Sequence, residues 1–268
     1  MAEERKWPPL IAVRNLYKIY TIGTVKVHAL NGVSFDVFEG EFVAIVGTSG
    51  SGKSTLLNML AGLEPPTKGT IRIAGKQIER MNEHELVAFR RNNVGFIFQS
   101  YNLLPTMNGV ENVAMPLMFR GVPREQRERA ARGVLKRVGL GHRMSHYPRQ
   151  MSGGQQQRVG IARAFVTKPE VVFADEPTGN LDSKTKAEVM DMICSFARDF
   201  NQTIVLVTHD PQMASYADRI VTLFDGRIID DRSNTAHSDY SDYSYHSDHF
   251  DYSDHSHRFN AAVQGVDR

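Results

Sequence analysis

The sequence predicts an α/β domain with a largely parallel core sheet, an antiparallel β layer at its N-terminal end and an inserted α-helical subdomain. Three observations support this fold class. Short β-branched runs alternate with helical patterns along residues 11–230, which is typical of a parallel sheet covered by helices. A glycine-rich turn separates an apolar run from a helical pattern at residues 47–54. Little strand pattern occurs from about 99 to 151, so we expect the helical subdomain at about 100–160.

Nine short segments have the composition of strands, being rich in valine, isoleucine and phenylalanine. They are 11–16, 33–37, 42–46, 70–73, 94–98, 171–174, 203–207, 220–224 and 227–229. The strands before residue 42 should form the antiparallel layer. The last segment follows Asp225-Gly226 and should return as a hairpin. Helices are expected after Lys53, Pro123, Ser152, Ser183 and Pro211.

The composition changes near Ser233, which indicates a folded domain at 1–232 followed by a tail at 233–268. The tail holds five of the ten histidines and six Asp against two Arg. Its charge of −4 leaves +6 on residues 1–232, which carry 30 basic and 24 acidic side chains. Because the tail has few aliphatic residues to offset its ordering entropy, we expect it to be disordered. A solvated appendage, a weak site for Zn²⁺, Ni²⁺ or Cu²⁺, and a docking segment remain alternatives for it.

Overall composition excludes several classes of protein. A net charge of only +2 argues against a strongly basic nucleic-acid binder. No apolar stretch approaches the roughly 18 residues that span a bilayer, and the first ten residues have no apolar signal core, so we expect a cytoplasmic chain. The only cysteine, Cys194, excludes an intramolecular disulfide and a cysteine-based zinc cluster, and we expect a buried structural thiol.

A phosphate-binding loop is predicted at residues 47–54, which match G-x-x-x-x-G-K-[ST] in full. Glycines let the backbone wrap around phosphate oxygens, and a helix N-terminus adds partial positive charge. Lys53 should reach the β- and γ-phosphates, and Ser54 should ligate Mg²⁺. The alternative is a glycine-rich turn before an ordinary helix. The residues expected to contact ATP here are Gly47, Thr48, Ser49, Gly50, Ser51, Gly52, Lys53, Ser54 and Thr55. They predict a P-loop NTPase core.

An apolar run at 171–174, expected to be a buried strand, is followed by two acidic residues. This pattern predicts the second half of the nucleotide site. Asp175 should hold Mg²⁺, through water, and Glu176 is the candidate general base for the attacking water. The alternative is a strand that simply ends in solvated acids.

A further motif, Met151-Ser152-Gly153-Gly154-Gln155, resembles the LSGGQ signature of ABC-type ATPases. Six motifs follow that family's order between residues 11 and 230. The chain looks most like the MacB/LolD/FtsE group, on the strength of GTSGSGKSTLLNMLAGLEPPTKG, IFQSYNLLPTMNGVENV, MSGGQQQRVGIARA and DEPTGNLDSKT. The resemblance implies ATP and Mg²⁺ as cofactors and ATP hydrolysis as the activity.

The resemblance also implies roles for four further residues. Tyr20 lies where such proteins stack an aromatic ring on adenine, although Tyr17 competes for the position and a locally packed tyrosine is the alternative. Gln99 resembles the glutamine that senses Mg²⁺ and the attacking water. His209 resembles the histidine that contacts the γ-phosphate, and Asp182 the acid that couples the two sites of a dimer. For Gln99 and His209 a purely structural role is the alternative.

In this family the signature completes the ATP site of a second subunit. Ser152, Gly153 and Gly154, with Gln155, would contact the γ-phosphate held by the other chain. One chain carries one P-loop and one signature. The resemblance therefore implies a head-to-tail dimer with two sites.

The same resemblance implies a separate membrane partner, similar to FtsX or MacB, that this ATPase drives from the cytoplasmic face of the inner membrane. Residues 99–105, from Gln99 to Pro105, would contact that permease, unless Leu103 and Leu104 are packed inside the subdomain. The work would be export, lipoprotein release or mechanical transmission. The alternative is an ABC ATPase of translation or DNA repair without a membrane partner. A single cassette with no heptad insertion or cysteine cluster argues against it, and no nucleic-acid partner is expected.

Overall fold

The computed structural model describes residues 8–234. The predicted tail lies outside the described residues, apart from Ser233 and Asn234. The core is a six-stranded sheet in the order β10-β9-β3-β8-β7-β6, in which β10 is the antiparallel edge strand and the other strands run parallel. Its strands are β3 (Phe42–Val46), β6 (Val94–Ile97), β7 (Val171–Asp175), β8 (Thr203–Thr208), β9 (Arg219–Phe224) and β10 (Arg227–Ser233). The predicted parallel core sheet is confirmed.

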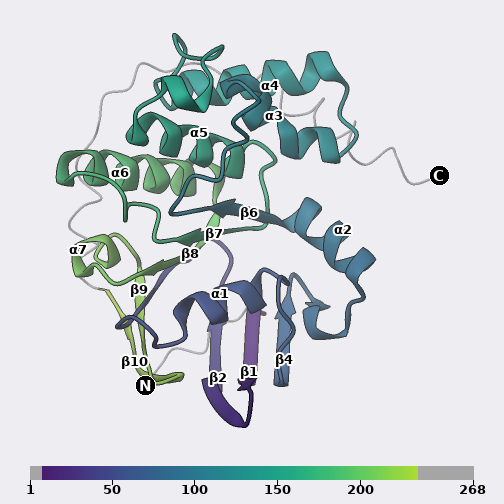
Figure 1. Ribbon diagram of the computed structural model, residues 1–268, viewed down its shortest axis with the longest axis vertical. Coiled ribbons are helices and arrows are strands. Elements are labelled where there is room, and N and C mark those ends of the chain that lie inside the picture. Colours follow the sequence, from purple (N-terminus) through teal and green to yellow (C-terminus); the bar gives the residue numbers. More distant parts are fainter. Residues whose placement is uncertain (1–7, 235–268) are drawn as a thin grey trace. The chain divides into compact units, whose positions relative to one another are not determined.

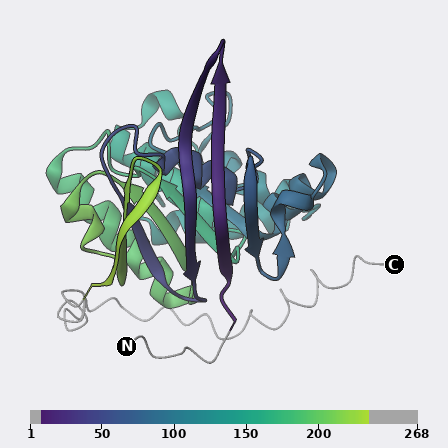
Figure 2. The same cartoon turned by 90° about the horizontal axis from the view of Figure 1, so that it is seen from below.

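The N-terminal layer is a four-stranded antiparallel sheet in the order β2-β1-β4-β5. It contains β1 (Ile11–Ile22), β2 (Val25–Val37), β4 (Lys68–Ile73) and β5 (Lys76–Gln77). Figure 2 shows β1 and β2 as one long hairpin. The sequence segments 11–16 and 33–37 cover only the buried half of this hairpin. Apart from the buried Leu30, its outer half is half-buried or exposed, so it lacks the continuous apolar pattern that marks a buried strand.

Seven α-helices accompany these sheets within the described residues. They are α1 (Lys53–Leu60), α2 (Glu83–Asn93), α3 (Gly109–Phe119), α4 (Arg124–Arg137), α5 (Gly153–Phe165), α6 (Ser183–Phe200) and α7 (Pro211–Ala214), with 3₁₀ turns at Ile78–Arg80 and Pro148–Gln150. Helix α1 packs between the two sheets, and α3 to α6 lie on the other side of the core sheet (Figure 1). Residues 98–170 contain helices and no strand, as expected for the helical insertion. Its boundaries, about 100–160, and the limit of the domain at 232 remain predictions.

The core sheet presents alternate residues to two separate apolar clusters, as the two-residue period of a strand requires. In β3, Val43 and Ile45 join the cluster that contains α1 and the antiparallel sheet. Phe42 and Ala44 join the cluster that contains α3 to α7. The central strands β3, β7 and β8 are therefore buried on both faces, so the charged side chains near them lie where these strands end.

Cys194 is buried in α6, which confirms the expectation of a structural thiol. Burial raises the pKa of this thiol to about 12, and the thiolate is the reactive form of cysteine. We therefore expect the folded protein to resist alkylation at pH 8 and to react fully once unfolded. Counting labelled thiols by mass spectrometry, with and without denaturant, checks this; rapid labelling of the native chain would contradict it.

Candidate nucleotide-binding site

The phosphate-binding loop joins β3 to α1, as the sequence predicts. Gly50 and Gly52 have φ values of 81° and 102°, a region that suits glycine. A Cβ on Gly52 would lie 2.4 Å from the carbonyl oxygen of Ala29, and one on Gly47 would lie 2.2 Å from that of Leu223. These two positions therefore exclude any side chain. Among the described residues no side chain caps α1, so its first N–H groups are available to an anion.

Lys53 lies at the start of α1 with its ammonium group inside the loop. Its Nζ donates to the carbonyl oxygens of Gly47 and Thr48, each at 2.8 Å. Burial lowers the pKa of Lys53, and the negative charges of Glu176 and Asp175 partly offset this by raising it. The Ser51 hydroxyl is buried and has no hydrogen-bond partner among the described residues. The loop thus holds a cation and an unsatisfied hydroxyl, which fits a phosphate group.

The two predicted acids stand at the end of β7, next to this loop. Burial first, and then the charge of Glu176, raise the pKa of Asp175, while Lys53 lowers it. Glu176 adopts a φ of 42°, and its backbone N–H donates to the carbonyl oxygen of Val207 on β8 at 2.9 Å. Its Oε1 lies 2.8 Å from Nδ1 of His209. The structure therefore brings Lys53, Asp175, Glu176 and His209 into one site.

Gln99 follows β6 and contacts the loop before α6. A Cβ on Gly179 would lie 2.7 Å from Nε2 of Gln99, and Asn180 donates to the Gln99 carbonyl oxygen at 3.1 Å. Asp182 caps α6: it accepts from the Thr185 hydroxyl at 2.7 Å and from the Thr185 N–H at 3.1 Å. These hydrogen bonds lower the pKa of Asp182. A role of Asp182 in coupling two subunits remains a prediction.

The signature motif forms the N-terminus of α5. Ser152 is the N-cap, and its hydroxyl accepts from the N–H of Gln155 at 3.3 Å while the Gln155 side chain accepts from the N–H of Ser152 at 3.1 Å. A Cβ on Gly154 would lie 2.7 Å from Cγ2 of Thr185. Ser152 is exposed. This helix end can therefore receive an anion from outside the chain.

Of the two competing tyrosines, Tyr20 lies beside the phosphate-binding helix. Its hydroxyl donates to Glu64 at 2.8 Å. Burial raises the pKa of Tyr20, with hydrogen bonds to Glu64 and, in the opposite sense, to Thr55 of α1 contributing. The Tyr17 hydroxyl instead lies over Gly32 in β2, 3.0 Å from where a Cβ would stand. This favours Tyr20 as the residue beside a bound nucleotide.

Two buried polar residues of α5 belong to this site and were missed from the sequence. Gln157 donates to the carbonyl oxygen of Pro177, directly after Glu176, at 2.5 Å. Arg163 donates to the carbonyl oxygens of Tyr101 and Asn102 at 2.8 and 2.5 Å. Both tie the signature helix to loops of the site. Polar residues on the buried face of an otherwise apolar helix were the signal available for them.

The residues present fit Mg²⁺ and a nucleotide triphosphate. Mg²⁺ prefers oxygen ligands, and the candidate ligands Ser54, Gln99 and Asp175 supply hydroxyl, amide and carboxylate oxygens. The uncapped α1, Lys53 and the Ser51 hydroxyl suit phosphate oxygens, as described above. These assignments remain predictions for the individual residues.

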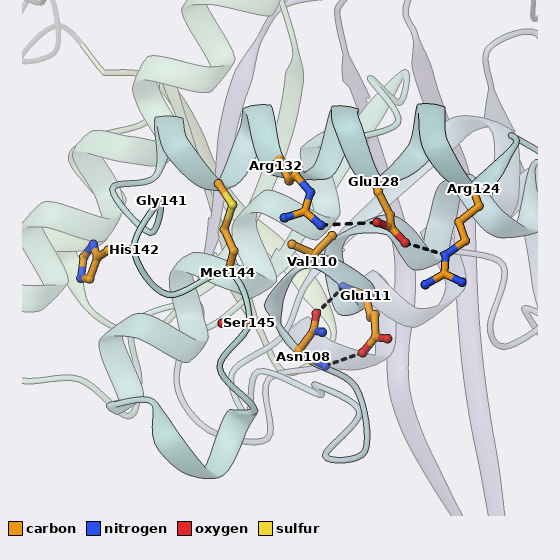
Figure 3. Close-up of a pocket in the computed structure, with 10 residues that line it drawn as sticks. All are labelled: Asn108, Val110, Glu111, Arg124, Glu128, Arg132, Gly141, His142, Met144 and Ser145. Carbon is orange, nitrogen blue, oxygen red and sulfur yellow. Dashed lines mark hydrogen bonds and ion pairs between the residues drawn. The ribbon is translucent and has the colours of Figure 1, made fainter.

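A separate pocket in the helical region takes no part in this arrangement (Figure 3). Its charged side chains already bind one another: Glu128 accepts from Arg124 at 2.8 Å and from Arg132 at 3.4 Å. Asn108 and Glu111 form the capping box of α3. None of the predicted nucleotide residues lines it.

Known proteins that resemble this chain support a nucleotide-binding site. Residues 30–179 match the family model described as ABC transporter. The uncharacterized ABC transporter ATP-binding protein of Thermotoga maritima is 50% identical over 214 residues, which are 80% of this chain and 91% of that protein. The lipoprotein-releasing system ATP-binding protein LolD of Geobacter metallireducens is 46% identical over 222 residues, 83% of this chain and 99% of that protein.

Longer relatives and solved structures extend the comparison. The macrolide export ATP-binding/permease protein MacB of Nitrobacter winogradskyi is 46% identical over 224 residues, which are 84% of this chain but 35% of that protein. A dimeric post-hydrolysis structure of the ATP-binding cassette MJ0796, bound to ADP and Pi, superposes with a TM-score of 0.78 at 39% identity and covers 84% of this chain and 98% of that chain. The chain therefore belongs to the ABC transporter family of ATP-binding proteins.

Proposed function

We propose that the protein is the ATP-hydrolysing subunit of a membrane ABC complex and works as a head-to-tail dimer. The observation that carries this proposal is the convergence of Lys53, Asp175, Glu176 and His209 at the ends of β3, β7 and β8. The relatives named above are transporter components, which favours a membrane complex over a role in translation or DNA repair.

The hydrolytic step requires a water molecule to attack the γ-phosphate. Lys53 would bind the β- and γ-phosphate oxygens, and Mg²⁺ held by Ser54, Asp175 and Gln99 would neutralise their charge. Glu176 would accept the proton of the attacking water. His209, whose Nδ1 lies 2.8 Å from Oε1 of Glu176, would donate from Nδ1 to this carboxylate and hold it in place beside the γ-phosphate.

Dimerisation supplies the remaining contacts of each site. Ser152, Gly153 and Gly154 stand at an exposed or half-exposed helix N-terminus, where the N–H groups favour negative charge. ATP held by one chain would bind this helix end of the other chain. Hydrolysis removes the γ-phosphate and with it the contact, so the dimer opens. The dimeric cassette structure of the relative MJ0796 supports this assembly.

An apolar groove between α2 and α3 is the candidate surface for the membrane partner. It has a volume of about 580 Å³ and is lined by Val87, Phe96, Phe98, Asn102 and Phe119, among others. Phe119 is 58% exposed and Val87 is 49% exposed. Within the permease contact predicted at 99–105, Leu104 is 39% exposed, whereas Leu103 packs against the core.

Replacing Phe119 by aspartate should therefore abolish capture of the membrane partner without changing the ATPase activity of the isolated protein, because Phe119 is not one of the residues of the ATP site. The measurement is co-purification from detergent-solubilised membranes, with mass spectrometry to identify the bound permease. Ile229→Asp is the matched control, since Ile229 is also an exposed apolar residue (63%) but lies on β10. Undiminished capture by Phe119→Asp would contradict the proposed surface.

Within the described residues 8–234 no helix is long and apolar enough to cross a membrane. We propose that the protein associates peripherally with the cytoplasmic face of the inner membrane through its permease partner. The relatives named as parts of export and lipoprotein-releasing systems support this location.

A further inference from the structure

We propose that Tyr101 is a positioning residue that links the permease-facing segment after Gln99 to the signature helix, and so controls whether ATP can close the dimer. This inference rests on the proposed function. Tyr101 is not among the residues expected to bind ATP or Mg²⁺, and its role follows from three observations on the segment after Gln99.

The first observation is a strained backbone that a buried arginine holds in place. Tyr101 and Asn102 have φ values of 61° and 47°, a left-handed conformation that is uncommon for residues other than glycine. Arg163 of α5 donates to both of their carbonyl oxygens, at 2.8 and 2.5 Å, and it is only 7% exposed. The turn is therefore fastened directly to the signature helix.

The second observation is that the Tyr101 ring reaches the first residue of that helix. A Cβ on Gly153 would lie 2.7 Å from Oη and 3.6 Å from Cζ of Tyr101. The end of the ring thus packs directly on the Gly153 backbone. Gly153 follows Ser152, the N-cap of α5, so this contact fixes the helix end that would receive the other chain's ATP.

The third observation connects this turn to the groove. Asn102 lines the groove, and Asn112 of α3 fastens the following residues. Its side chain accepts from the N–H of Leu104 at 2.8 Å and donates to the carbonyl oxygens of Leu104 and Met107 at 3.1 and 2.9 Å. The segment is tied to α3 at one end and to α5 at the other. A partner that displaces it moves Tyr101, and Tyr101 moves Gly153.

The test uses the full chain with Glu176→Gln, which should retain ATP and accumulate the dimer. Tyr101→Asn and Tyr101→His shorten the side chain so that it no longer reaches Gly153, and both residue types tolerate a left-handed backbone. Tyr101→Phe keeps the ring. Tyr17→Asn is the matched control, because the Tyr17 hydroxyl makes the same kind of contact with Gly32, away from the signature.

Two quantities are measured: the affinity of the monomer for a fluorescent ATP analogue, and the dimer dissociation constant at saturating ATP by sedimentation. We expect Tyr101→Asn and Tyr101→His to weaken the dimer about tenfold or more, a usual size for coupling between sites. Monomer affinity should stay at the parent value. Tyr101→Phe should remain near the parent protein, and Tyr17→Asn should leave the dimer unchanged.

A dimer of parent strength in both shortened variants would overturn the role of Tyr101. Equal losses of monomer affinity and dimer strength would also overturn it, because they would show general damage to the fold. If the Glu176→Gln parent itself failed to dimerise with ATP, the proposed function would fail instead, so the two failures are distinguishable.

Discussion

Replacing Glu176 by glutamine should reduce ATP turnover by about 10²- to 10⁴-fold, the usual contribution of a general base, while ATP binding is retained. Glutamine keeps the size of the side chain and the possibility of a hydrogen bond to His209, which lies 2.8 Å from Glu176. It removes only the ability to accept a proton. Because hydrolysis would no longer release the γ-phosphate contact, the ATP-bound dimer should accumulate. Phosphate release and sedimentation with ATP measure the two effects.

The matched control for this experiment is Glu170→Gln. Glu170 is an exposed glutamate immediately before β7, the strand that Glu176 follows, and its replacement should leave turnover unchanged. If Glu176→Gln kept most of its activity, the assignment of the general base would be wrong. A site formed by Lys53, Asp175 and His209 would then need another group to accept the proton of the attacking water.

Lys53→Ala should raise the dissociation constant for ATP by about 100-fold, which corresponds to about 3 kcal/mol and is a typical value for charge-assisted hydrogen bonds. Its Nζ lies among the carbonyl oxygens of Gly47 and Thr48. The carboxylates of Asp175 and Glu176 repel the phosphates. Without the Lys53 ammonium group, no positive charge at residue 53 would offset this repulsion. Isothermal titration with ATP and Mg²⁺ measures the change.

Lys68→Ala is the control for Lys53→Ala, because Lys68 is an exposed lysine on β4. The unfolding midpoint without nucleotide should be recorded for both variants, since Lys53 also binds two loop carbonyl groups. Near-native ATP affinity in a folded Lys53→Ala protein would contradict the phosphate-binding role.

Where apolar residues are continuous, the strands were predicted almost to the residue. Predicted strand 42–46 equals β3, and 203–207 is one residue shorter than β8, because both lie in a sheet buried on two faces. Helix α2 was not predicted. Within it only Phe89 and Asn93 are buried, so it has almost no apolar stripe. The local signals of its start were the capping box of Asn82 and Glu85 and the acidic Glu83 in the first turn.

The candidate site shows the same division between local and long-range information. Motifs whose chemistry depends on neighbouring residues, such as 47–54 and Asp175-Glu176, could be located in the sequence. The contact of Tyr101 with Gly153 and the hydrogen bonds of Arg163 to Asn102 join segments about 50 to 60 residues apart. No spacing rule connects such residues, because the path of the intervening helices decides which of them meet.

The central claim is that each complete ATP site takes its P-loop from one chain and its signature from the other. Ser49→Cys and Ser152→Cys test it most directly when each is made in the Glu176→Gln protein with a tag of different size. Both positions are exposed, and the native Cys194 is buried. The two proteins are mixed and treated with a short bis-maleimide, with and without ATP and Mg²⁺. We expect a product that joins the two different chains and forms only with ATP. Absence of that product, or cross-links only between two Ser49→Cys chains, would contradict it.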